Sequence, residues 1–169
     1  MNRTVGIVGR IVAGAIVLAG AATSLAAGPI AGDEAVPDRA GPWAFTRQMA
    51  ATPAVEDGDV WLLLACEGSR LAAAVMNATG FPFAAAPESS LVLRFAGHPD
   101  FVVEALAISE HQLTISAAAA RRLLPLIIDS ERTVVVIGDG EGVAHSYTFS
   151  LQPNGLALAG IVRECWDGR

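Results

Sequence analysis

The sequence predicts a mainly β (α+β) domain, an antiparallel β-sandwich or curled sheet in which one helix precedes a C-terminal hairpin and a second helix ends the chain. Three observations carry this prediction. Beyond residue 42, most of the chain consists of short apolar or alternating runs separated by turn signals, which is typical of strands. Only two stretches, 117–128 and 155–166, place apolar residues at helical spacing. The chain has two cysteines, Cys66 and Cys165, which suits a single disulfide.

The first 27 residues have the three parts of a secretory signal peptide. Two arginines and no acid precede residue 11, and an uncharged run rich in small residues follows over 11–27. Ser24-Leu25-Ala26 offers small residues at a cleavage site, so we expect processing near Ala26 or Ala27 and a periplasmic product. The alternative is a retained membrane anchor, since the uncharged run continues to Gly32, although Gly and Ala make it weakly apolar for a span of about twenty residues.

The remaining chain divides into a short leader and one domain. Residues 28–42 are rich in Gly, Pro and acids and show no period, so they predict a flexible leader. Residues 43–169 form one exported β-rich domain, because the roughly 143 residues left after cleavage suit a single core.

The first part of the domain predicts a meander of strands. Residues 43–49 read as an edge strand and residues 50–59 as a loop with a turn at Asp57-Gly58-Asp59. Residues 60–66 are apolar on both parities, which predicts a central strand covered on both faces. Further strands are expected over 70–78, 90–97, 101–109 and 112–116. In the strand 90–97, Leu91, Leu93 and Phe95 face one way and Arg94 faces the other.

The period then changes to that of a helix. Ser116 is a suitable N-cap for a helix over 117–128, and Pro125 either kinks this helix or ends it at Leu124. Strands over 132–138 and 142–151 form the hairpin that follows. In the predicted helix 117–128, the apolar positions are Ala120, Leu123 or Leu124, and Ile127.

The chain ends in a second helix over 155–166, with Asn154 as its predicted N-cap. Cys165 lies on the apolar stripe of this helix and therefore points at the core. Cys66 ends the most buried strand, so a bridge between them would tie the helix to the sheet centre. The stripe consists of Leu158, Ile161, Val162 and Cys165.

The predicted export determines whether the two cysteines are expected to be free or paired. In an oxidising compartment two cysteines are expected to pair, so we predict the bridge Cys66–Cys165. A catalytic redox pair is disfavoured, because such cysteines are usually close in sequence and a helix end disfavours a thiolate. We expect Trp166 to cover the bond from water.

The charge of the chain excludes two classes of partner. After cleavage, seventeen acids face nine arginines, a net charge of about −8. No basic stripe is present, so nucleic acid is excluded and anionic membrane surfaces are disfavoured. Contact with a membrane is expected only if the signal segment is retained.

Candidates for chemistry are few, and we predict no catalytic residue, no metal site and no cofactor. The three histidines do not form a set of metal ligands. The weakest alternative function is a cryptic hydrolase, with Ser146 beside His145 as its nucleophile. The glycine-rich stretch 138–142 predicts a hairpin turn, because a phosphate loop must open a helix. Asn77-Ala78-Thr79 matches a glycosylation acceptor by chance, and Arg121-Arg122 suits a solvated helix face.

The succession LLLAC, SLVLRF, a helix, RTVVVIG, YTFSL and GLALAGIVRECW resembles the VasI/TagO-like family of periplasmic proteins associated with type VI secretion. The helix–hairpin layout and the tail are also similar to the invasion-associated locus B proteins, a second family of exported domains. The sequence departs from the first family in having less chain between its Trp strand and its Cys strand.

The resemblance implies a non-enzymatic accessory protein that binds an envelope protein or a cell-wall component. It implies the pairing of Cys66 with Cys165. It also implies that Trp43, Arg94 and Trp166 are structural positions or part of a partner surface. The alternative that it leaves open is a general periplasmic binding domain linked to virulence or stress.

Overall fold

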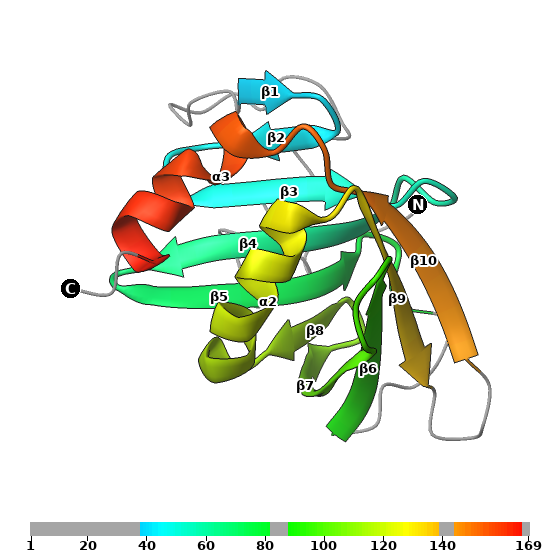
Figure 1. Ribbon diagram of the computed structural model, residues 1–169. Coiled ribbons are helices and arrows are strands. Elements are labelled where there is room, and N and C mark those ends of the chain that lie inside the picture. The colour runs from blue at the N-terminus through cyan, green and yellow to red at the C-terminus, as the bar shows by residue number, and fades with distance from the viewer. Residues whose placement is uncertain (1–37, 82–87, 139–143, 167–169) are drawn as a thin grey trace, which may run out of the picture.

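A single curled sheet with two helices on one face makes up the described part of this computed structural model, residues 38–81, 88–138 and 144–166 (Figure 1). All neighbouring strands are antiparallel, in the order β1-β2-β3-β4-β5-β8-β7-β6-β9-β10. The strands are β1 (Asp38–Ala40), β2 (Trp43–Phe45), β3 (Met49–Pro53), β4 (Val60–Glu67), β5 (Arg70–Asn77), β6 (Glu88–Phe95), β7 (Phe101–Ser109), β8 (Gln112–Ile115), β9 (Arg132–Gly138) and β10 (Ala144–Ser150).

The sheet bends so far that its last strand returns to its third. Ala54, just after β3, forms an isolated bridge with Phe149 of β10, and the Val55 N–H donates to the Thr148 carbonyl at 2.8 Å. The contact is limited to this short stretch, so the sheet is curled and not closed. The predicted mainly antiparallel β fold, with a helix before the C-terminal hairpin and a helix at the end, is confirmed.

Both helices pack on the inner face of the curl (Figure 1). The helix α2 (Ala117–Asp129) packs on β5, and the α-helix α3 (Gly155–Ile161) packs on β1 to β4 before continuing into the π-helix η1 (Val162–Trp166). The predicted cap is present, because the Ser116 Oγ accepts from the Ala119 N–H. Side chains of α2 and α3 are buried in the main core at Ala120, Leu123, Leu124, Ile127, Ala157, Leu158 and Ile161.

The central strand β4 is buried on both of its faces, as its sequence predicts. Its inward side chains, among them Leu62 and Leu64, belong to the main core with the helices. Its outward side chains, Trp61, Leu63 and Ala65, form a separate cluster with residues of β3 and β5. The sheet therefore has apolar side chains on its outer face as well.

The start of the domain differs from the prediction. Residues 43–49 are not one strand, since β2 ends at Phe45 and β3 begins at Met49, and 50–53 belong to β3 instead of a loop. The Ala-rich β3 carries little amphipathic signal, and it becomes a strand because it pairs with β4 from Met49↔Ala65 to Pro53↔Trp61. Residues 38–40 of the predicted leader form β1, whereas 28–37 lie outside the described residues.

The order of the middle strands also differs from a simple meander, because β5 pairs with β8 and not with β6. Ten residues separate β5 from β6, whereas two separate β7 from β8. A tight hairpin needs a short connection, which β7 and β8 have. The connection of ten residues between β5 and β6 is long enough for β6 to pair on the far side of β7 instead of beside β5.

Two positions of the helices differ in part from the sequence prediction. Of the two alternatives for Pro125, an end of the helix at Leu124 is wrong, because α2 continues through Pro125 to Asp129. The missing N–H leaves only the carbonyl of Arg121, an exposed residue, without a helical partner. Asn154 occupies the N-cap position of α3 but makes no cap bond; its Nδ2 donates to the Ile127 carbonyl at 2.9 Å. Asn154 thus joins the start of α3 to the last turn of α2.

Across the described ranges, no helix combines the length and apolar content needed to cross a bilayer. The predicted signal segment 1–27 lies outside these ranges.

Candidate functional site

The disulfide Cys66–Cys165 joins β4 to η1 across 99 residues of sequence, with the two Cα atoms 5.8 Å apart. Both cysteines are buried, with exposed fractions of 4% and 3%, so the bridge belongs to the core. It fastens the end of the chain to the centre of the sheet. The predicted pairing is confirmed.

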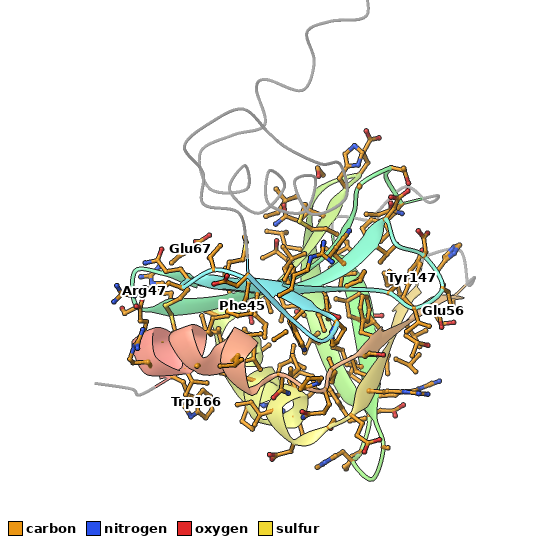
Figure 2. All side chains as sticks on the ribbon, turned by 90° about the horizontal axis from the view of Figure 1, so that it is seen from above. Phe45, Arg47, Glu56, Glu67, Tyr147 and Trp166 are labelled. Atoms are coloured by element: carbon orange, nitrogen blue, oxygen red, sulfur yellow. A yellow bond between two sulfur atoms is a disulfide. The ribbon has the colours of Figure 1, made fainter. Side chains whose placement is uncertain are left out.

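The π-helix determines which side chains of the last turn face the sheet. A π-turn places more residues in each turn than an α-helix, so the side chains that follow it are rotated about the axis. Cys165 is buried, whereas Trp166 is 39% exposed, and Figure 2 shows Trp166 on the side of the terminal helix away from the sheet. The expectation that Trp166 covers the bond is therefore wrong, and the core itself shields the sulfurs.

A second attachment holds the terminal helix to the turn between β2 and β3. The Arg47 Nε donates to the Glu164 Oε1 at 2.5 Å, and Figure 2 shows Arg47 beside the end of that helix. This hydrogen bond is the main cause that lowers the pKa of Glu164, and the charges of Arg47 and Arg163 act in the same direction. The pair is separated by 117 residues, so no local pattern could have indicated it.

Gly160 makes the close approach of helix and turn possible. A Cβ built on Gly160 would collide with the carbonyl oxygen and carbonyl carbon of Arg47. Only glycine allows the helix backbone to lie this close to the turn. In addition to its buried apolar side chains, the terminal helix is thus held by this backbone contact, the ion pair and the disulfide.

Trp43 and Arg94, the other two residues implied by the resemblance, lie in opposite environments. Trp43 is fully buried, and its Nε1 donates to the Leu151 carbonyl at 2.7 Å, so it is a structural residue. Arg94 is exposed on the outer face of β6, and its Nε lies 3.3 Å from the Asp100 Oδ2. Trp43, Arg94 and Trp166 are therefore not neighbours in one site.

The outer face of β7 carries the clearest exposed apolar surface in the described chain. Val102, Leu106 and Ile108 have exposed fractions of 64%, 60% and 49%, and exposed Glu104 lies among them. The inward residues Phe101, Val103 and Ala105 belong to the core. We call Val102, Leu106 and Ile108 the β7 stripe. Sequence reasoning missed it because both faces of this strand are apolar.

The seam where β10 returns to β3 contains two groups with altered acidity, both labelled in Figure 2. The Thr148 N–H donates to the Glu56 Oε2 at 2.8 Å, and hydrogen bonding to Thr148 lowers the pKa of Glu56. Burial, with the charge of Asp57 added, raises the pKa of Tyr147. The hydrogen bond from Thr148 to Glu56 therefore joins β10 to the segment that follows β3 at the edge of the sheet.

The histidines lie at separate places in the fold. The His111 Nδ1 lies 3.1 Å from the Asn77 carbonyl, and its Nε2 lies 3.2 Å from the Glu110 carboxylate. His145 and Ser146 are neighbours on β10 and pair with Ile137 and Val136 of β9. Wherever side chains are described, no three His, Cys, Asp or Glu residues are grouped as metal ligands.

The other motifs considered in the sequence take part in a turn or in a contact within the fold. Asn77 is buried, and its Oδ1 accepts from the backbone and the hydroxyl of Thr79, so the acceptor motif is part of a turn. The guanidinium of Arg122 lies 5.2 Å from the ring centroid of Phe101, so this arginine contacts the sheet as well as solvent. Of the stretch 138–142, residues 139–142 lie outside the described residues.

Comparison of the chain with protein-family models, with curated proteins and with solved structures finds no match. The resemblance to the VasI/TagO-like and invasion-associated locus B families rests on the sequence motifs alone.

Proposed function

We propose that this chain is a non-enzymatic, exported interaction domain that binds an envelope protein or a cell-wall component in the periplasm. The observation that carries the proposal is the buried disulfide between the central strand and the terminal π-helix. Disulfides persist in oxidising compartments and are rare in the cytosol, and the first 27 residues have the composition of a signal peptide.

The β7 stripe supports the proposal that the domain acts by binding. Exposed apolar side chains with polar neighbours are typical of protein interfaces. Here Glu104 lies between Val102 and Leu106, the pair Arg94–Asp100 lies at one end of the stripe, and a sheet presents it. A partner with a complementary apolar surface would cover the three side chains.

By its resemblance to the VasI/TagO-like family, the domain would serve the assembly of a type VI secretion-like machine. The second candidate is a general periplasmic domain of the invasion-associated locus B type, and the helix–hairpin–helix tail favours it equally. Neighbouring genes for sheath or membrane-core components would support the first candidate and oppose the second.

Export is tested by producing the full chain in a Gram-negative bacterium and measuring the intact mass of the periplasmic product. We expect a chain that starts at Ala27 or Gly28 and has no thiol available for alkylation without reductant. A species that retains Met1 in the membrane fraction would contradict the proposal.

Binding through the β7 stripe is tested by photo-cross-linking in intact cells. A photoreactive residue at Glu104 should form an adduct with one envelope partner, and Val102→Glu should abolish that adduct. The matched control is a photoreactive residue at Leu156, which is also exposed but lies on α3, away from the stripe. Adducts of equal yield from both positions would show that β7 is not the binding surface.

A further inference from the structure

The apolar surface of the β7 stripe continues onto β6 and β9 as a row of three valines. The strand registers place Val102 opposite Val92, and Val92 opposite Val136. The alternate positions of these strands belong to the core, so the three valines point outward. Val102 is 64% exposed, and the other two are half-buried. We call these three residues the valine row; α2 and α3 pack on the opposite face of the sheet.

Two opposite charges lie on either side of the valine row. Arg94 follows Val92 by two residues on β6, so it lies on one side of the row. Glu104 follows Val102 by two residues on β7, which runs antiparallel to β6, so it lies on the other side. Both side chains are exposed. The Arg94 Nε contacts Asp100, whereas no cation of the described residues lies within ion-pair distance of Glu104.

This arrangement is complementary to itself. In a two-fold dimer the same patch serves both copies, so two different residues of the patch meet each other twice. A two-fold axis along the valine row stacks each valine on the same valine of the second copy. Sheets packed face to face cross at about −30°, and neighbouring strands lie about 4.8 Å apart, with about 6.8 Å between every second residue of a strand. With these values the crossing carries Arg94 of one copy over Glu104 of the other.

We propose that a second copy of this chain packs on the valine row, with Arg94 of each copy paired to Glu104 of the other. A guanidinium has five N–H donors, so Arg94 can hold Asp100 and Glu104 at the same time. The interface then has an apolar centre and a charged rim, which is the usual anatomy of a protein interface. The second copy supplies the cation that Glu104 lacks within its own described chain.

The dimer goes beyond the proposed function, because it names what covers Val102 when no envelope partner is bound. A partner on the β7 stripe would take the place of the second copy, so partner binding and dimerisation would compete. The dimer itself depends neither on export nor on the partner.

Two charge reversals test the pairing across the axis. In Arg94→Glu two carboxylates face each other at both contacts, and in Glu104→Arg two guanidinium groups do. Each variant alone should raise the dissociation constant of the dimer at least about tenfold, since like charges placed together across an interface cost several kcal/mol. Mixed in equal amounts, the two variants should form a dimer with the original affinity, because both contacts again join opposite charges.

Sedimentation velocity at increasing protein concentration measures the mass and the dissociation constant. The full chain is made by cell-free translation under oxidising conditions. Arg121→Glu, the same charge change at an exposed position of α2, is the matched control and should leave the dimer intact. A chain that stays monomeric, a dimer that Arg94→Glu leaves intact, or two variants that do not pair when mixed would overturn the proposal. The sample contains no envelope protein, so this test and the test of the proposed function can fail separately.

Discussion

Trp43 and Glu164 are single residues that connect distant parts of the chain. Trp43 at the start of β2 donates a buried hydrogen bond to Leu151, which follows β10. Glu164 in η1 accepts one from Arg47 in the turn after β2. Both bonds span more than a hundred residues of sequence, so each can be tested by removing one polar group.

Replacing Trp43 by Phe should lower the free energy of unfolding by at least about 1–3 kcal/mol, because the buried Leu151 carbonyl loses its donor. Urea denaturation measures the change. Trp166→Phe is the matched control, and it should change stability by less than about 0.5 kcal/mol since Trp166 is partly exposed. Equal effects of the two changes would contradict the structural role of Trp43.

The ion pair of Glu164 should make stability depend on pH. Because its pKa is lowered in the folded protein, the carboxylate stabilises the fold above its ordinary pKa of about 4.5, and this contribution is lost as the pH falls through the lowered value. Glu164→Gln should therefore lower the melting temperature at pH 7, and the difference from the unaltered chain should shrink below about pH 4.5. Melting curves between pH 7 and pH 3 measure this, with Glu104→Gln as an exposed control. A difference that stays constant with pH would argue against the ion pair.

At the scale of elements, the attachment of α3 depends on small residues as much as on apolar ones. Gly41 turns between β1 and β2 with a φ of +60°, and a Cβ there would meet the ring of Pro153. Gly160 likewise leaves room for a close contact, because a Cβ there would collide with the Arg47 backbone that lies against α3. Small residues thus allow the terminal helix to lie directly on the first three strands.

Gly160→Ala should lower the free energy of unfolding by about 1–3 kcal/mol, because the added methyl group would push the helix away from the Arg47 backbone. Gly155→Ala in the same helix is the control, since a Cβ there meets no atom within 4 Å. Alanine favours a helix by up to about 1 kcal/mol over glycine, so the control should be neutral or more stable. Denaturant titrations of both variants give the comparison, and a stabilised Gly160→Ala variant would show that helix and turn are not in tight contact.

At the scale of the whole molecule, the disulfide closes a loop that contains most of the domain. In the chain-entropy model, closing about 100 residues stabilises a fold by roughly 4.7 kcal/mol, against a total of about 5–15 kcal/mol for a typical domain. The bridge spans 99 residues and includes strands β5 to β10 and both α-helices.

The double change Cys66→Ala/Cys165→Ala should therefore remove a large part of the stability, about 3–5 kcal/mol. Denaturant titration with and without reductant measures this loss, and reductant should have no effect on the double variant. If thiol reagents modify both cysteines of the unreduced, folded protein, the bridge does not form and its contribution is absent.

Local patterns in the sequence determined much of this fold. The two-sided apolar run of β4, the alternation around Arg94, the Ser116 cap and the pairing of Cys66 with Cys165 could all be predicted. They could be predicted because each depends on side-chain parity, on a neighbouring residue or on the small number of cysteines. Local propensity and burial act over a few residues, so a single sequence displays them directly.

Only the tertiary structure decided how these parts are connected. The strand status of β1 and β3 comes from pairing, since the three residues of β1 and the Ala-rich β3 carry almost no pattern of their own. The neighbours of β5, the ion pair Arg47–Glu164 and the exposure of Trp166 depend on contacts between residues far apart in sequence or on a π-turn that propensities do not signal. The two faces of β7 are hard to tell apart in the sequence, because a buried apolar side chain and one exposed to solvent have the same chemistry. What lies over each face differs, and that is a property of the folded molecule.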